Sequence, residues 1–163
     1  HDIIAAFNRV HSTQPVFATC VDIDARAVEY GRKMVHHNQL SEVIEFVHGD
    51  ASGITPTPRR YDIASVIGLL EYLTPENCVQ FLAGVKDLLK TDSRILICNM
   101  REHALSKPMA FLGVWKLEYK RLEVLEEITR ASGFDIEKAY YWPQGLNSFV
   151  IARNRAAQPF GQY

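Results

Sequence analysis

Polar residues follow the apolar stretches of this chain at the points where strands of a sheet would end. Asp22 closes the apolar run at residues 16–21, and a helix-like segment begins at Ala25. A carboxylate at such a strand tip is where α/β proteins bind the two hydroxyls of a ribose, because it accepts several hydrogen bonds. Asp24 is placed to cap the helix that follows, which leaves Asp22 available for a ligand.

Three more strand ends carry similar residues. Asp50 and Ala51 follow the second apolar stretch, the sequence from Gly68 through Glu71 follows the third, and Asn99 ends the fourth. In open parallel sheets, ligands bind outside the carboxyl ends of the strands. We therefore expect these residues to lie at one edge of a sheet and to contribute to one site.

Strands and helices alternate along the chain, which predicts an α/β fold. We expect a doubly wound, mostly parallel sheet with helices on both faces, and an antiparallel C-terminal strand pair around Pro143 and Gly145. One domain would span residues 1–153, followed by a frayed tail at residues 154–163. The expected helices are residues 2–10, 25–38, 75–89 and 122–132, and the expected strands are 17–21, 43–47, 61–67, 94–99, 135–141 and 148–152.

The composition excludes several classes of partner. The 163 residues carry a formal net charge of -1 with acids and bases mixed, so neither nucleic acid nor a membrane surface is expected as a partner. No apolar run approaches the ~20 residues of a membrane span, and no signal peptide is visible. Three widely spaced cysteines favour buried thiols in a reducing cytoplasm over disulfides, and no histidines have metal-ligand spacing.

The order and spacing of five segments resemble the class I S-adenosylmethionine-dependent methyltransferases, of the bacterial small-molecule type. The segments are VDIDARAVEYGRK, EFVHGDAS, YDIASVIGLLEYLTPE, RILICNM and ASGF, and the resemblance covers nearly the whole chain. It implies that Asp22 binds the ribose hydroxyls and that Ile23 packs on the adenine. It also implies that Asp50 accepts a hydrogen bond from the adenine amine, that the Ala51 amide reaches a ring nitrogen, and that Gly68 lies near the methionyl part.

The same resemblance implies transfer of a methyl group from a sulfonium to a small molecule by in-line displacement. The protein then mainly aligns donor and acceptor and excludes water, so no catalytic residue is assigned. If the acceptor is a hydroxyl, a base would help, and Glu71 and His103 are the candidates. A carboxylate acceptor needs no base.

The acceptor pocket is expected at the third and fourth strand ends and in the segment after Asn99. Aromatic side chains predominate there, which suits an apolar or planar substrate. An alternative is that Phe111, Trp115 and Tyr119, spaced four apart, form one helix face packed on the sheet. The oligomeric state is not specified by the sequence. The candidate lining residues are Tyr72, Asn99, Met109, Phe111, Trp115 and Tyr119.

One expected part of the fold is missing from the sequence. In the family that it resembles, a central first strand and a glycine-rich loop precede the first helix, yet none of the nine glycines forms a GxGxG motif. A sheet without that strand leaves two neighbours unpaired, at about 1–3 kcal/mol for each unsatisfied buried group. We therefore expect the chain to be part of a longer protein whose upstream residues supply the strand.

Two other functions are also compatible with the sequence. An NAD(P)-dependent oxidoreductase also places an acid at the end of its second strand. The Gly49-Asp50 pair and the antiparallel strands at the end of the chain count against it. The second alternative is a non-catalytic Rossmann-like binding module that has kept the fold without the cofactor.

Overall fold

The computed structural model describes residues 9, 16–53, 60–113, 117–143 and 145–155. They fall into two compact units, His1–Thr55 and Pro56–Tyr163, which are described separately. The helix expected at residues 2–10 lies outside the described residues, except for Arg9.

The first unit is a parallel strand pair with one helix packed on it. Strands β1 (Ala18–Asp22) and β2 (Ile44–His48) are joined by helix α2 (Ala25–His37), and the 3-10 turn η1 (Ala51–Gly53) follows. The two strands run in register, so that Asp22 lies beside His48. Asp24 caps α2 by accepting a hydrogen bond from the Arg26 amide at 2.8 Å, which confirms the role expected from the sequence.

The core of the first unit joins one face of α2 to the strands. Val28 and Val35 of α2 are buried, as their spacing predicts, together with Leu40 and Ile44. Helix and sheet approach closely at Gly31, where a methyl group would overlap the ring of Phe46. Only glycine fits at that point of the helix.

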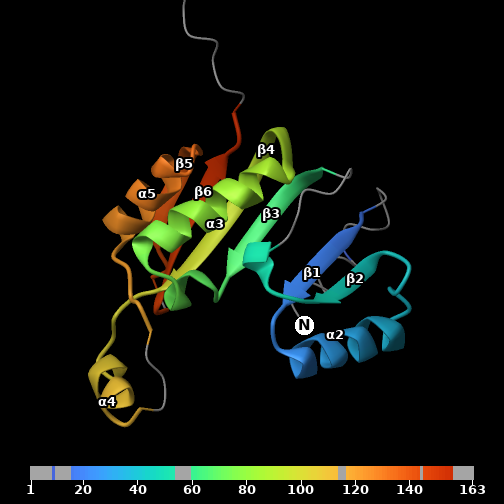
Figure 1. Ribbon diagram of the computed structural model, residues 1–163, viewed down its shortest axis with the longest axis horizontal. Coiled ribbons are helices and arrows are strands. Elements are labelled where there is room, and N and C mark those ends of the chain that lie inside the picture. The colour runs from blue at the N-terminus through green and yellow to red at the C-terminus, as the bar shows by residue number, and fades with distance from the viewer. Residues whose placement is uncertain (1–8, 10–15, 54–59, 114–116, 144, 156–163) are drawn as a thin grey trace, which may run out of the picture. The chain divides into compact units, whose positions relative to one another are not determined.

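The second unit is a four-stranded sheet in the order β3-β4-β6-β5. Strand β3 runs parallel to β4, whereas β6 is antiparallel to both β4 and β5. Helices α3 and α5 pack against each other over β4, β5 and β6 (Figure 1). The parallel pairs and the antiparallel C-terminal pair confirm the predicted fold class. The elements are β3 (Tyr61–Ile67), η2 (Leu70–Tyr72), α3 (Pro75–Asp87), β4 (Leu89–Met100), α4 (Ser106–Phe111), α5 (Leu122–Ala131), β5 (Asp135–Tyr141) and β6 (Asn147–Arg153).

Strand β4 is longer than the sequence predicted. It begins at Leu89 instead of residue 94, because α3 ends at Asp87 and the chain enters the sheet at once. A register shift between Tyr61 and Ile63 of β3 accommodates the additional residues of β4, and Asp92 has a left-handed φ of 62°. Because the residues in this bulge are polar, the pattern of apolar residues in the sequence does not indicate where the strand begins.

Asn154 is buried and anchored, so the expectation of a frayed tail beginning there is wrong. Its backbone amide donates to the carbonyl of Ser93 at 2.9 Å. Its side-chain amide donates to the carbonyl of Lys90 at 3.1 Å, near the bulge of β4. The backbone amide of Asp92 in turn donates to the Asn154 carbonyl at 2.7 Å.

The described strands form two open sheets, whose outer strands are β1 and β2 in the first and β3 and β5 in the second. Among the described residues, no strand pairs with the second edge of β1 or of β3. Ile63 and Ile67 of β3 are 69% and 63% exposed, which is unusual for large apolar residues in a strand. Separately, none of the described helices has the length and apolar character needed to cross a bilayer.

Two helix glycines provide a matched test of this packing. Gly31→Ala should destabilise the protein, because overpacking against Phe46 costs about 1–3 kcal/mol and improved helix propensity offsets only about 1 kcal/mol. Gly84→Ala in α3 has open space around its Cβ and should stabilise by about 0.4–1 kcal/mol. Urea unfolding followed by circular dichroism measures both changes, and equal effects would contradict the close contact at Gly31.

Candidate functional site

In the first unit, the residues expected to bind a cofactor lie at the carboxyl ends of β1 and β2. One carboxylate oxygen of Asp22 (Oδ1) accepts a hydrogen bond from the Asp24 amide at 2.9 Å. The Asp22 carbonyl accepts from the Gly49 amide at 3.0 Å, which ties the two strand ends together. The second oxygen, Oδ2, has no protein partner among the described residues and is available to a ligand.

Asp50 is held by the turn that follows β2. Its Oδ1 accepts hydrogen bonds from the Ser52 hydroxyl at 2.7 Å and from the Ser52 amide at 2.8 Å. These two bonds hold the pKa of the Asp50 carboxyl below its usual range, so the group is ionised at neutral pH. Ala51 begins the 3-10 turn, and its N–H has no partner among the described residues.

His48 is a residue of this edge that the sequence did not identify. Its ring Nε2 lies 3.1 Å from the carbonyl oxygen of Ile23, and this contact steadies the loop after β1. The Ile23 side chain is 69% exposed and can pack against a flat ligand. The register of the two strands places His48 beside Asp22, so a correct pairing of the strands would have revealed it.

The chemistry of these groups fits the adenosine part of the implied cofactor. Asp22 offers an acceptor oxygen for ribose hydroxyls, and Asp50 offers one for an exocyclic amine. Ala51 offers a backbone donor for a ring nitrogen, while Ile23 offers apolar surface. The two neighbouring strand ends of the first unit thus carry four groups that complement the polar and apolar parts of an adenosine.

In the second unit, Gly68 ends β3 in a conformation that favours glycine. Its φ is +70°, in the left-handed region, and nothing lies within 4 Å of the position that a Cβ would occupy. The backbone conformation by itself therefore favours glycine at this position. The contact with a methionyl group that the resemblance implies stays a prediction.

Glu71 is buried instead of lying in an exposed loop. It is 5% exposed, and its Oε1 accepts a hydrogen bond from the Met100 amide at 2.7 Å. Its main-chain carbonyl also accepts from the Glu118 amide at 2.7 Å. Because the Glu71 carboxylate already binds the Met100 amide, its observed contacts are those of a group that positions the end of β4. Its role as a base stays a prediction. The neighbouring Tyr72 side chain is exposed.

Lys120 was not singled out from the sequence, although it is one of the most constrained side chains of the second unit. It is 4% exposed, and its ammonium donates to the carbonyls of Leu70 and Leu73 at 2.8 Å and of Glu118 at 3.0 Å. Three carbonyls match the three hydrogens of an ammonium group. Lysines are rarely buried, so a sequence pattern gives no reason to expect this one inside.

Asn99 lies beneath the strand ends rather than on their surface. Its side chain is fully buried, donates to the Met100 carbonyl at 2.8 Å, and lies opposite Ser148 in the sheet. Four buried oxygens have no partner among the described residues, which makes them places for bound water or for polar ligand atoms. They are Oε2 of Glu71, Oδ1 of Asn99, the Tyr119 hydroxyl and the Ser148 hydroxyl.

The aromatic residues of the segment after Asn99 do not form one helix face, so that alternative is wrong. Helix α4 ends at Phe111, which is 90% exposed, and Tyr119 lies in an irregular segment. Met109 is half-buried in α4, and Trp115 lies outside the described residues. Pro108 and the Gly113 turn (φ +66°) keep the helix short.

His103 packs edge-on against Tyr119, with ring centroids 5.9 Å apart. Its Nδ1 lies 3.3 Å from the Leu105 amide, which donates to it. An accepting Nδ1 in the neutral ring leaves the proton on Nε2. His103 also lines a hollow of about 440 Å³ together with Glu102, Ala104 and Lys107.

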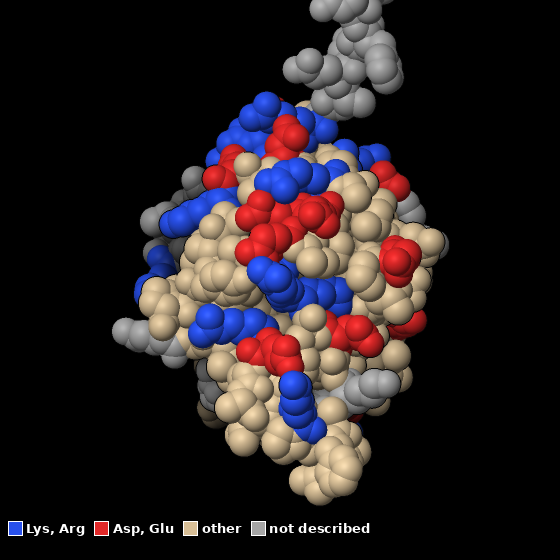
Figure 2. Space-filling model, turned by 90° about the vertical axis from the view of Figure 1, so that its left-hand side faces the viewer, with Lys and Arg blue, Asp and Glu red and all other residues tan. Residues whose placement is uncertain are grey.

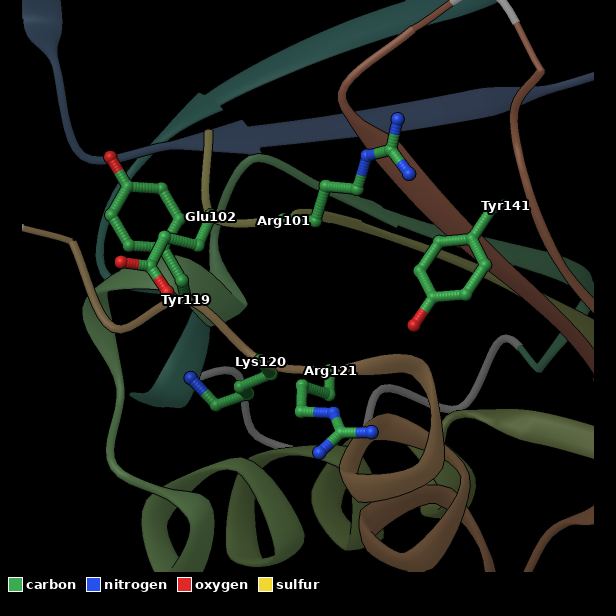
Figure 3. A pocket seen from close by; sticks show the side chains of 6 residues that line it. All are labelled: Arg101, Glu102, Tyr119, Lys120, Arg121 and Tyr141. Atoms are coloured by element: carbon green, nitrogen blue, oxygen red, sulfur yellow. The ribbon is translucent and has the colours of Figure 1, made fainter. Parts of the chain in front are cut away.

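A second, smaller pocket adjoins this hollow through the shared residue Glu102. Its volume is about 230 Å³, and Figure 3 shows its six lining side chains around one opening. Tyr119 is the predicted acceptor-site residue that the structure places here. The lining residues are Arg101, Glu102, Tyr119, Lys120, Arg121 and Tyr141.

Charges of both signs are interspersed on the face shown in Figure 2. Opposite charges also pair within the sheet of the second unit, where Glu137 of β5 pairs with Arg94 at 2.8 Å and with Arg153 at 2.5 Å. Hydrogen bonds from these two arginines hold the pKa of the Glu137 carboxyl below its usual range. Among the described residues in the view of Figure 2, acidic and basic side chains alternate and neither sign forms a large patch.

Comparison with known families agrees with the geometry of the strand ends. A family model described as a methyltransferase domain matches residues 4–92, more than half of the chain. The chain belongs to this methyltransferase family. The match contains both strand ends of the first unit, with Asp22 and Asp50, and also Gly68 and Glu71 of the second. No curated protein sequence matches the chain significantly.

Solved structures share the fold of this methyltransferase domain at low sequence identity. The pyocyanin biosynthetic protein PhzM is 17% identical with a TM-score of 0.71, covering 94% of this chain and 46% of PhzM. Magnesium protoporphyrin IX methyltransferase from Synechocystis PCC 6803, solved with bound SAH, is 12% identical with a TM-score of 0.70, covering 95% and 81%. The [4+2]-cyclase SpnF is 14% identical with a TM-score of 0.74, covering 92% and 70%. The chain thus spans about half the length of PhzM.

Replacing Lys120 tests whether the buried ammonium stabilises the strand ends. Lys120→Met keeps most of the volume but leaves three carbonyls without their donor, so the free energy of unfolding should fall by about 3 kcal/mol. Lys107→Met, at an exposed position of α4, should change it by less than about 0.5 kcal/mol. Urea unfolding of the full-length protein compares them, and equal stabilities would show that Lys120 has no such role.

Proposed function

We propose that this domain transfers a methyl group from S-adenosylmethionine to a small-molecule acceptor. The observation that carries the proposal is the pair of carboxylates at adjacent strand ends, Asp22 and Asp50, each with one oxygen that no other described residue binds. Membership of the methyltransferase family supports the same reaction. The structural relative solved with SAH supports the choice of cofactor.

The first unit would hold the adenosine half of the cofactor. Asp22 would bind the ribose hydroxyls through Oδ2, since its Oδ1 is fixed by the Asp24 amide. Asp50 would accept from the adenine amine, and the Ala51 amide would donate to a ring nitrogen. The exposed side chain of Ile23 would pack on the adenine. The fixed carboxylates lower the entropy cost of binding, because their orientation is set before the ligand arrives.

The cofactor, when bound, supplies an activated methyl group on a sulfonium. The residues of the chain would then act by positioning the acceptor and by excluding water. Glu71 would contribute by holding the Met100 amide, which fixes the end of β4 where the acceptor segment begins. Acceptor contacts are proposed for Tyr72, Asn99, Met109, Trp115 and Tyr119. Should the acceptor be a hydroxyl, His103 would be the proposed base, because it lines the larger hollow.

The alternatives from the sequence receive less support. The matching family is a methyltransferase family, and nothing in the comparisons supports a nicotinamide-dependent oxidoreductase. The non-catalytic Rossmann-like binding module receives no support from them either, because the fold shared with the [4+2]-cyclase SpnF is that of another enzyme. Detection of methyl transfer to any acceptor would distinguish the proposed function from both alternatives.

We also propose a cytoplasmic location in a bacterial cell, and a single domain at residues 1–153. The three cysteines are free, and burial raises the pKa of the Cys20, Cys78 and Cys98 thiols. Such thiols suit a reducing compartment. The proposed partner is a small molecule, with neither nucleic acid nor membrane.

Replacing Asp22 and Asp24 separates ligand binding from helix capping. Asp22→Ala should weaken S-adenosylmethionine binding by about 10- to 100-fold, the effect of losing hydrogen bonds to a charged group. Asp24→Ala should leave that affinity nearly unchanged and lower stability by about 1 kcal/mol through loss of the cap. Isothermal titration and urea unfolding of the full-length protein measure the two effects. Unchanged affinity in Asp22→Ala would exclude this residue from the site.

The role of Asp50 can be tested with a changed ligand. S-inosylhomocysteine carries an oxygen where S-adenosylhomocysteine carries the exocyclic amine, so the wild-type protein should bind it about tenfold more weakly. In the Asp50→Ala variant, the difference in binding affinity between S-adenosylhomocysteine and S-inosylhomocysteine should largely disappear. A preference of the same size in both proteins would show that another group reads the amine.

A further inference from the structure

We propose that the pocket around Arg101 binds a carboxylate of the methyl acceptor, and that Arg101 is the residue that selects it. This inference rests on the proposed function, because it names the chemical class of the acceptor. It assigns a role to Arg101 and Tyr141, which are not among the acceptor residues named above. All of the residues involved belong to the second unit.

Arg101 is a half-buried cation that forms no ion pair with any other described residue. It directly follows β4, and one terminal nitrogen of its guanidinium donates to the Gly145 carbonyl at 3.1 Å. The guanidinium carbon also lies 5.5 Å from the centroid of the Tyr141 ring. Among the described residues, no carboxylate lies within ion-pair distance of it. A guanidinium has five N–H donors, so most of them remain available to a ligand.

Tyr141 adds a second donor to the same pocket. Its hydroxyl oxygen accepts a hydrogen bond from the Leu122 amide at 3.2 Å, at the first turn of α5. Since the oxygen is used as an acceptor, the hydroxyl hydrogen can be donated to a ligand. The positive end of the α5 dipole lies at the same place, which further favours an anion.

The other charges of the pocket are already in use or lie apart from this donor pair. The Lys120 ammonium is bound by three carbonyls, and Arg121 pairs with Glu123 at 3.3 Å. Glu102 would repel an anion, but Figure 3 shows it beside Tyr119, across the opening from Tyr141. Arg101 and Tyr141 therefore provide the anion-binding side of the pocket.

The size and position of the pocket indicate the kind of anion. A volume of about 230 Å³ is smaller than the roughly 300–1,000 Å³ of sites for whole drug-sized ligands. It suits one carboxylate with the ring or chain that carries it. A planar guanidinium binds a carboxylate through two parallel hydrogen bonds, and the Tyr119 and Tyr141 rings provide flat walls. The remainder of the acceptor can extend into the adjoining hollow at His103.

Benzoate and its neutral analogue benzamide test the inference in the full-length protein by ligand-observed NMR titration. We expect benzoate to bind at least about tenfold more tightly than benzamide. Arg101→Gln should weaken benzoate binding about tenfold and leave benzamide binding unchanged. Arg155→Gln removes the same charge from an exposed arginine that pairs with Asp135, and should change neither affinity.

Other outcomes are equally informative. Equal binding of the two probes, no benzoate binding at about 10 mM, or an equal effect of Arg101→Gln and Arg155→Gln would each overturn the role of Arg101. Should Arg101→Gln unfold, Tyr141→Phe should weaken benzoate binding about threefold, and unchanged binding would overturn the inference. S-adenosylmethionine titration of the wild-type protein is the separate control. If the cofactor binds but benzoate does not, only the acceptor class is wrong, whereas failure to bind the cofactor would overturn the proposed function itself.

Discussion

Parallel pairing of strands is the constraint on which the strand-end residues of each unit depend. In a parallel pair the carboxyl ends meet at one edge, so residues far apart in the sequence become neighbours. This places Asp22 beside the turn that carries Asp50, and it places Gly68 near Asn99. A shift of register by one residue would reverse which face each strand residue occupies, so the buried faces of the strands fix the positions of the site residues.

In the second unit, the turn η2 also brings together residues that are far apart in the sequence. Its Glu71 side chain holds the end of β4, while the carbonyl of Leu70 in the turn and that of Leu73 directly after it bind Lys120 from the segment before α5. Three separate parts of the chain are thereby joined by charged groups that are almost fully buried. Such groups are costly to desolvate, so the loss of any one partner would destabilise this end of the sheet. The pocket at Arg101 lies next to this cluster, because Lys120 is one of its lining residues.

The sequence predicted what depends on local chemistry. The cap at Asp24, the strand tip at Asp22 and the antiparallel final pair were all predictable from residue type and spacing. The burial of Glu71, Lys120 and Asn154 could not be predicted from the sequence. These side chains are stable in the interior because they bind carbonyls and amides that only the tertiary fold brings close to them. Asp22 and Asp50 could be predicted as site candidates, whereas Arg101 and Tyr141 follow only from the pocket between distant segments.

The Lys120 ammonium also has a consequence for chemical reactivity. An amine attacks acylating reagents through its lone pair, yet this nitrogen keeps all three hydrogens directed at carbonyl oxygens and is almost inaccessible to solvent. It can react only when η2 separates from the segment before α5. Exposed lysines such as Lys107 react without any such opening. The rate at which Lys120 is acylated therefore reports how often this end of the sheet opens in the native protein.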